Sequence, residues 1–251
     1  MFAERVQSRR REYEEAFRRN CECPEIDEIL VFREGQPELP ACSKLSVRDI
    51  GRRAEYRDYL DWVNELAQPD DISIIANADI YFDTQLALLR RHILAPTSVM
   101  ALSRWERAAS GDIFLHDHND SQDAWVFRGP AREMCADFPV GVPRCDNRFV
   151  SELEKAGYNV INPSFSIRSY HVHAGQREAY PAGGDAGFVP PPYGYVWPHN
   201  LMPLHSTVLH NLHHPSEKLG WRFDKRRWSS RLKLHWFARA LKFLGATSHP
   251  R

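Results

Sequence analysis

A short apolar segment that runs directly into acidic residues constrains this chain more than any other stretch. Residues 72–76 (Ile-Ser-Ile-Ile-Ala) follow two aspartates and lead into Asn77, Asp79 and Asp83. A β-branched run of this length predicts a buried parallel strand with both faces covered. Ligands of open α/β sheets bind beyond the carboxyl ends of the strands. The polar residues after the strand are therefore candidates for a functional site.

The polar side chains after this strand suit a hard metal cation. Carboxylate and amide oxygens bind Mg²⁺ or Mn²⁺ well, and such a cation usually also contacts the phosphates of a substrate. A structural interpretation is also open, because Asp79 and Asp83 could simply cap the turn into a helix that begins near Leu86. An isolated Asn-x-Asp does not decide between the two, so the rest of the chain must.

The elements around this strand alternate between helix and strand. The sequence predicts helices over residues 4–19, 53–66, 86–93 and 149–156, and strands over residues 26–32, 72–76, 98–103, 121–130, 158–161 and 167–173. This order is typical of an α/β fold with a parallel sheet. The polar residues 106–121, which include His116 and His118, are predicted to form a long loop that acts as a lid or binds an acceptor.

The charge of the chain is balanced in total but unevenly distributed. Its 251 residues contain 33 Lys and Arg and 33 Asp and Glu, yet residues 217–251 hold ten Lys and Arg against two acidic residues. The acidic body argues against a nucleic-acid-binding surface, and the basic end predicts an anionic partner. No stretch approaches the roughly 18 apolar residues of a membrane span. Because the first residues also lack the apolar core of a signal peptide, we expect a cytoplasmic protein.

The chain is expected to divide into a domain over residues 1–180 and an extension over residues 181–251. Residues 181–198 are rich in Gly, Pro and aromatic residues, which predicts an extended segment. Residues 226–244 are predicted to form an amphipathic helix with one apolar and one basic stripe. Such a helix suits peripheral attachment to an anionic membrane at its inner face, and it equally suits packing on the domain; both alternatives stay open.

The motifs follow one another in an order that is more specific than any one of them. Asn77-Ala78-Asp79 ends a strand, Asp146 starts a helix, the pattern EL..AGY.V spans residues 152–160, and a last strand closes in His171 and His173. Over residues 5–175 this order resembles the GT-A glycosyltransferases, in particular family-2-type enzymes and a largely uncharacterised bacterial subgroup. The resemblance implies a GT-A-like (Rossmann-like) mixed sheet flanked by helices.

The resemblance also implies a function. A hexosyltransferase of this type moves a sugar from a nucleotide-sugar donor to a hydroxyl of a glycan or lipid-linked acceptor, with inversion, as in polysaccharide biosynthesis. It implies that Asn77 and Asp79 bind the donor diphosphate and that Asp79, with His171 or His173, holds Mn²⁺ or Mg²⁺ as cofactor. Asp146 corresponds to the base that deprotonates the acceptor, although Asp is also a good helix N-cap.

Three further residues complete the predicted site. Asp123, at the entrance of the strand over residues 121–130, either orients a sugar or only begins the strand. Glu34 follows a strand at a point where a ribose could bind, or else is a turn residue. Arg53, at the start of a helix, either contacts phosphates or is solvated.

Two departures from the family pattern lead to alternatives. The family opens with a strand that carries the base-binding loop, whereas this chain begins almost directly with a helix, so that this strand is expected to be missing. Asn77 replaces the first Asp of a DxD motif and contributes no charge. Both departures favour a catalytically silent relative that binds a sugar or a partner protein. A third alternative is a metal-dependent phosphate-transfer enzyme that uses Asp79 and Asp83.

Overall fold

The computed structural model describes residues 7–35, 38–92, 94–107, 110–172, 187–216 and 218–224. Chain packing divides the molecule into two units, Met1–Gly220 and Trp221–Arg251. The described part of the predicted extension, up to Gly220, belongs to the first unit, whereas the predicted basic helix over residues 226–244 lies outside the described residues. Within the described ranges, no helix is both long and apolar enough to cross a membrane.

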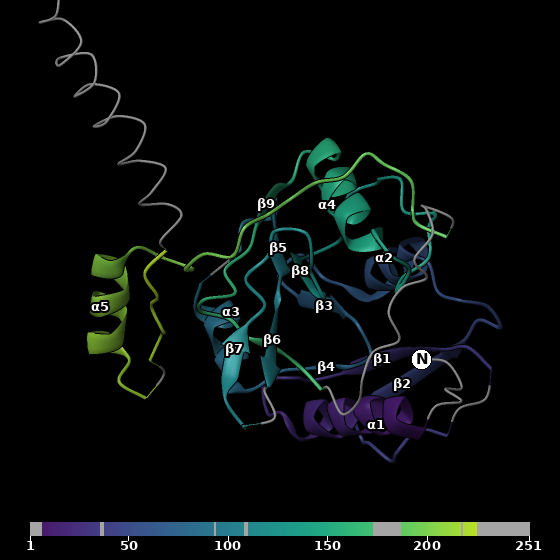
Figure 1. The fold of residues 1–251 in the computed structure, drawn as a ribbon, viewed down its shortest axis with the longest axis horizontal. Coiled ribbons are helices and arrows are strands. Elements are labelled where there is room, and N and C mark those ends of the chain that lie inside the picture. The colour runs from purple at the N-terminus through teal and green to yellow at the C-terminus, as the bar shows by residue number, and fades with distance from the viewer. Residues whose placement is uncertain are drawn as a thin grey trace, which may run out of the picture. The chain divides into compact units, whose positions relative to one another are not determined.

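The first unit is an α/β structure in which helices flank mixed sheets (Figure 1). The predicted class is therefore confirmed at this level. Its elements are, in chain order, α1 (Gln7–Glu22), β1 (Ile29–Arg33), β2 (Leu45–Asp49), α2 (Tyr56–Leu66), β3 (Ile72–Ala76), β4 (Ile80–Tyr81), η1 (Thr84–Leu86), α3 (Ala87–Arg91), β5 (Ser98–Leu102), β6 (Arg104–Arg107), β7 (Ile113–Leu115), β8 (Ala124–Arg128), α4 (Cys145–Lys155), β9 (Asn159–Ile161), β10 (Ser169–His171) and α5 (Leu204–His213).

A four-stranded sheet with the order β3-β8-β5-β9 carries the predicted central strand. The strand over residues 72–76 is confirmed, but its predicted parallel pairing is wrong, because Ile74 lies opposite Val126 in an antiparallel ladder with β8. Only β5 and β9 are parallel in this sheet. An apolar run reports that both faces of a strand are covered and carries no information about the direction of its neighbour.

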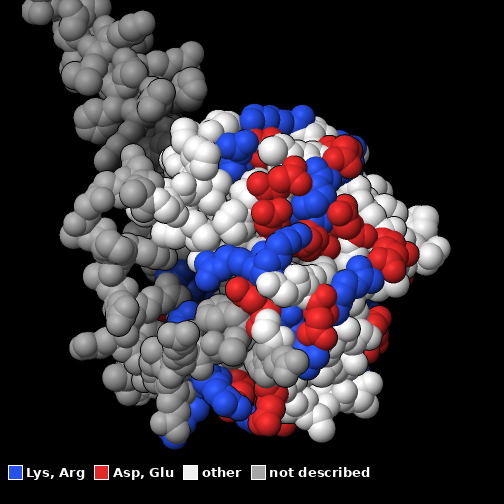
Figure 2. All heavy atoms as spheres, turned by 90° about the vertical axis from the view of Figure 1, so that its right-hand side faces the viewer, with Lys and Arg blue, Asp and Glu red and all other residues white. Residues whose placement is uncertain are grey.

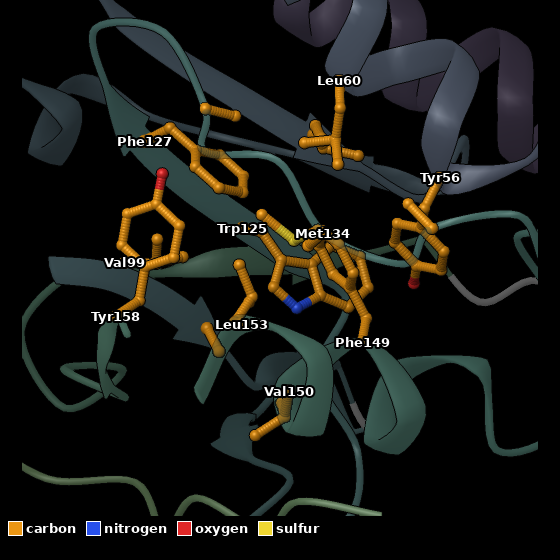
Figure 3. Close-up of a cluster of buried hydrophobic side chains, with 14 of the residues drawn as sticks. Tyr56, Leu60, Val99, Trp125, Phe127, Met134, Phe149, Val150, Leu153 and Tyr158 are labelled. Atoms are coloured by element: carbon orange, nitrogen blue, oxygen red, sulfur yellow. The ribbon is translucent and has the colours of Figure 1, made fainter. Parts of the chain in front are cut away.

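Two hydrophobic clusters cover the two faces of this sheet. Along β5, Val99 and Ala101 belong to one cluster and Met100 and Leu102 to the other, as expected for a strand whose side chains alternate between faces. In the first cluster, shown in Figure 3, Tyr56 of α2, Trp125 of β8 and Phe149 of α4 meet. The rings of Tyr56 and Phe149 stack at a centroid distance of 4.0 Å. This packing fixes α2 and α4 on one face of the sheet.

The remaining strands form two smaller sheets. β1 and β2 pair in parallel, and a mixed sheet has the order β4-β10-β6-β7. The predicted loop over residues 106–121 is partly wrong, because β6 and β7 form an antiparallel hairpin in which Trp105 lies opposite Leu115. β2 and α5 were not predicted. The five residues of β2 mix polar and apolar side chains and are partly exposed, which gives only a weak strand signal.

Most predicted helices exist, with shifted bounds. The predicted helix over residues 86–93 is a 3₁₀ turn, η1, followed by the short helix α3. α4 begins at Cys145 rather than at residue 149, and Gly157, with a φ of 81°, follows its end. The earlier start places Asp146 inside the first turn of α4.

Charges of both signs are interspersed on the face of the molecule shown in Figure 2. Many of them form exposed ion pairs; Arg52 and Asp58, for example, approach to 2.7 Å, and Arg57 and Glu133 to 2.8 Å. Alternating charges of this kind neutralise one another locally. This face therefore presents no field of a single sign.

Candidate active site

A cleft of about 1730 Å³ opens at the carboxyl end of β3. It is lined by parts of α1, β1, α2, β3 and α4 and by the residues that precede β8. The lining includes six predicted site residues, namely Glu34, Arg53, Asn77, Asp79, Asp123 and Asp146. A typical small-molecule pocket has about 300–1,000 Å³, so this cleft is larger than one ligand requires.

Asn77 and Asp123 meet because β3 ends where β8 begins. Ala76 lies opposite Ala124, and the Asn77 N–H donates to the Asp123 carbonyl at 3.0 Å. The side-chain amide of Asn77 donates to Asp123 Oδ1 at 2.8 Å. Asp123 therefore does lead into a strand, and its carboxylate is held at the cleft by a neighbour that sequence alone identified only as a metal or phosphate contact.

Arg104, at the start of β6, is the second partner of Asp123. Its guanidinium lies 3.1 Å from Asp123 Oδ2, 2.6 Å from the Ser121 hydroxyl and 2.6 Å from Glu106 Oε1. Burial opposes the charge of Arg104, but the two adjacent carboxylates raise its pKa above the ordinary value. A buried charge that is paired on both sides is held in one position.

Asp79 belongs to the same set of charges through His171. His171 Nε2 lies 3.3 Å from Asp79 Oδ2, and its Nδ1 lies 3.6 Å from Glu106 Oε2. The contact with His171, together with Arg104, holds the pKa of Glu106 well below its usual range. On the other side, Arg9 of α1 lies 3.6 Å from Asp79 Oδ2. Polar contacts thus connect Asp79 to Arg104, and so to Asp123.

Asp79 and His171 are the described residues that could hold a cation. A carboxylate and an imidazole are donors that Mn²⁺ accepts. Within the part of the chain that the structure describes, no group of three or more His, Cys, Asp or Glu is arranged to hold a metal ion. A cation at this pair would complete its shell with substrate phosphates and water, as Mg²⁺ commonly does. The third predicted ligand, His173, lies outside the described residues.

Asp146 connects α4 to the segment that leads into β8. Its Oδ1 accepts from the Asn147 N–H at 2.9 Å, and its Oδ2 accepts from the Gln122 N–H at 3.3 Å. The N-cap position of α4 is occupied by Arg144, with a φ of 69°, so the interpretation of Asp146 as the N-cap is wrong. Removal from water, together with the nearby Asp123, raises the pKa of the half-buried Asp146 to about 6. A carboxylate with this pKa can take up a proton near neutral pH.

Asp83 has a structural role. It is the N-cap of η1, where its Oδ1 accepts from the Gln85 N–H at 2.9 Å, and the Tyr170 hydroxyl donates to its Oδ2 at 2.8 Å. It is not among the residues that line the cleft. The capping interpretation is confirmed for Asp83, and a phosphate-transfer site built from Asp79 and Asp83 is not formed.

Several residues of the cleft carried little or no sequence signal. His116 and His118, seen in the sequence only as part of a polar loop, stack at 4.3 Å between ring centroids and line the cleft. Arg9 and Arg104 were missed, although an Arg-x-Glu directly after a buried strand would have been a usable signal for Arg104. Gln122 was also missed; it is 1% exposed, and its Oε1 has no hydrogen-bond partner among the described residues.

Comparison of the chain with protein-family models, with curated proteins and with solved structures gave no match. The resemblance of its motifs to glycosyltransferases therefore stays a prediction. The function has to be inferred from the geometry of the cleft.

Proposed function

We propose that the cleft binds a nucleotide sugar and that the protein transfers the sugar, with inversion, to a hydroxyl of a glycan or lipid-linked acceptor, as a GT-A-type hexosyltransferase does. The observation that supports this most is the convergence of residues from separate segments in one cleft. Asp79, Asp123 and Asp146 line it together with Glu34 and Arg53. Three carboxylates with an arginine suit a ligand that carries both hydroxyls and phosphates.

Asp146 is the proposed base for the acceptor hydroxyl. With a pKa of about 6 it is mostly ionised at neutral pH and still basic enough to accept a proton. Each of its oxygens accepts one backbone N–H, and a carboxylate has about four acceptor positions, so capacity remains for a substrate hydroxyl. The proton of the acceptor would move to this carboxylate as the new glycosidic bond forms.

The donor is proposed to bind at the other side of the cleft. Asp79 with His171 would hold Mn²⁺ or Mg²⁺, which when bound neutralises the leaving diphosphate. Arg53 lines the cleft, which supports a contact with the donor phosphates, and Glu34 lines it as the candidate for the ribose. Asp123, held by Asn77 and Arg104, is a fixed acceptor for sugar hydroxyls.

The change Asp146→Asn tests this assignment. Asn keeps the size of the side chain and removes the base, so turnover should fall by about 10²–10⁴-fold. Binding of the donor should stay unchanged, because the base acts on the acceptor. Calorimetry with UDP-glucose and GDP-mannose in Mn²⁺, alongside a transfer assay, measures both quantities. Asp137→Asn, at an exposed carboxylate paired with Arg57, is the matched control and should leave both quantities unchanged. An equal loss in both variants would contradict the role of Asp146.

A second candidate function is sugar binding without catalysis. It is favoured by Arg9, 3.6 Å from Asp79, and Arg104, 3.1 Å from Asp123, since these cations already neutralise two of the three carboxylates. Incubation with a panel of nucleotide sugars separates the two functions. Binding with release of a nucleoside diphosphate supports transfer, and binding without release supports the silent relative. Absence of binding to every donor in the panel would contradict both.

A further inference from the structure

Two strands that border the cleft are paired on one edge in the described structure. β1 pairs with β2, and β3 pairs with β8, and each of these strands ends its sheet. Residues 29–32 of β1 and residues 72–76 of β3 all line the same cleft. The part of the cleft away from Asp146 therefore separates two sheet edges.

The backbone of β1 is directed into this space. The Ile29 N–H and the Arg33 carbonyl form hydrogen bonds on the side of β2, at 2.8 and 3.2 Å. In a strand, alternate residues present their backbone groups to opposite edges. Leu30 and Phe32 consequently direct their N–H and C=O groups away from β2, toward the cleft.

The backbone of β3 is directed into the same space from the other side. The Asp71 carbonyl and the Asn77 N–H bond to residues that flank β8, at 2.8 and 3.0 Å. By the same alternation, Ile72, Ile74 and Ala76 present their backbone groups to the cleft. Exposed edges of this kind are templates for pairing with another strand.

Helices close the space on its other two sides. Tyr13 and Phe17 of α1 line it, as do Trp62 and Leu66 of α2. Figure 1 shows α1 and α2 on opposite sides of β1 and β2. Leu66, although apolar, is 45% exposed. Two strand edges and two helices with apolar side chains are the surroundings of a central strand in an α/β sheet.

We propose that this part of the cleft is the seat of one further β-strand, an extended apolar segment that leads into α1. It would pair with β1 and β3 at once and join the sheets in the order β2-β1-strand-β3-β8-β5-β9. The lining by Leu30, Val31, Ile72 and Ile74 selects uncharged, β-branched side chains. The polar end of the cleft, with Asp123 and Asp146, stays open to ligands.

The connection to α1 follows from the chirality of parallel strands. Parallel neighbours need a crossover of about a dozen residues or more, usually a helix, and the crossover is right-handed in about 98% of cases. α1 has 16 residues, precedes β1 directly and flanks the cleft. A strand that enters α1 and lies beside β1 would complete one strand–helix–strand unit. A strand supplied by another molecule would lack this connection.

The experiment adds such a strand to the full chain. About six residues of alternating Val, Ile and Thr, a typical strand length, are fused ahead of Met1. A control fusion carries Pro at two alternate positions, because Pro cannot donate to a ladder. Amide hydrogen exchange of β1 and β3 is measured in both fusions and in the unextended chain. The Val/Ile/Thr fusion should slow exchange at Leu30, Ile72 and Ile74 by about tenfold or more and raise the melting temperature, since opening then requires breaking new pairs.

Three results would overturn the proposal. In the first, the two fusions exchange at equal rates, which shows that the added strand does not pair. In the second, the unextended chain already protects the amides of Leu30 and Ile72 as strongly as the fusion does. In the third, the same peptide protects them only when added free in solution, which points to a strand from a partner protein rather than one that leads into α1.

Discussion

The Asp146 carboxyl is bounded by the first turn of α4 and the segment before β8, and it faces the cleft. Two backbone N–H groups stabilise its charge, while partial removal from water and the nearby Asp123 oppose it. The opposing effects are larger, because the pKa rises from the ordinary 3.8 to about 6. The same shift that suits a base at neutral pH also destabilises the folded protein when the carboxyl is ionised.

The stability of the protein should therefore depend on pH through Asp146. Its folded pKa, about 6, lies above the ordinary 3.8, so the folded state binds the proton more tightly. The resulting stabilisation is complete below about pH 4 and is lost as the pH rises through 6. The shift corresponds to at most about 3 kcal/mol, and to less because the carboxyl is partly solvated.

Asp146→Asn removes this dependence, because Asn carries no charge at any of these pH values. Urea unfolding of the variant and the wild type at pH 4, 6 and 8 measures the effect. The variant should gain stability relative to the wild type as the pH rises. A difference that stays constant from pH 4 to 8 would show that the carboxyl is not buried enough to be perturbed.

The position of Asp146 depends on an extended segment that crosses α4. Residues 187–200 run over this helix (Figure 1), and the Gly194 N–H donates to the Asn147 carbonyl at 2.8 Å. The side chain of Asn147, fully buried, donates to the Gly194 carbonyl at 3.3 Å. The contact is close because residue 194 has no side chain: a Cβ there would lie 2.5 Å from Val150 Cγ1 and 2.8 Å from the Ser151 nitrogen.

Gly194→Ala should therefore push the segment away from α4. The forced repacking is expected to lower the free energy of unfolding by about 1–3 kcal/mol. Turnover should fall as well, since the first turn of α4 carries Asp146. Gly220→Ala is the control, because its Cβ would meet only the Phe165 carbonyl at 3.7 Å, an ordinary contact. Equal melting temperatures for the two variants would show that the segment does not constrain the helix.

Elements whose signal is local could be predicted from the sequence. Residues 72–76 combine β-branched side chains with polar ends, and their strand has the predicted bounds. The direction of its neighbour could not be predicted, because pairing with β8 depends on contacts about 50 residues apart. The same limit applies to η1, where the predicted helix over residues 86–93 starts with a tighter turn around Asp83.

The candidate site shows the same division. Asp79 and Asp83 look equivalent in the sequence, four residues apart after one strand. Tertiary structure separates them, since His171 and Arg9 approach Asp79 at the cleft whereas Tyr170 and Gln85 bind Asp83 away from it. Arg104 could not be identified because its partners, Asp123 and Glu106, are brought together only by folding.

In the whole molecule, charge and apolar packing are distributed differently along the chain. Both apolar clusters of the central sheet are formed by residues up to Leu219. Chain packing divides the molecule directly after Gly220. Residues 217–251, in contrast, carry ten of the 33 Lys and Arg and only two acidic residues. Stability and attraction to anions are therefore expected to reside in different parts of the chain.

Deletion of residues 225–251 tests this separation. We expect the melting temperature to stay unchanged, because the described clusters remain complete. We also expect the full chain, and not the truncated one, to sediment with vesicles that contain phosphatidylserine. Each Lys or Arg near such a surface contributes on the order of 1 kcal/mol. Salt at about 1 M should weaken the binding, because it shortens the Debye length to about 3 Å.

The opposite pattern would favour a C-terminal helix that packs on the domain. In that case the deletion exposes apolar surface and lowers the melting temperature, and the full chain does not bind vesicles at any salt concentration. Binding that persists at high salt would indicate apolar insertion as the larger contribution, since screening acts only on the charges. The two constructs at low and high salt, compared with their melting curves, therefore decide whether the basic end attaches an acceptor-modifying enzyme to a membrane or stabilises its fold.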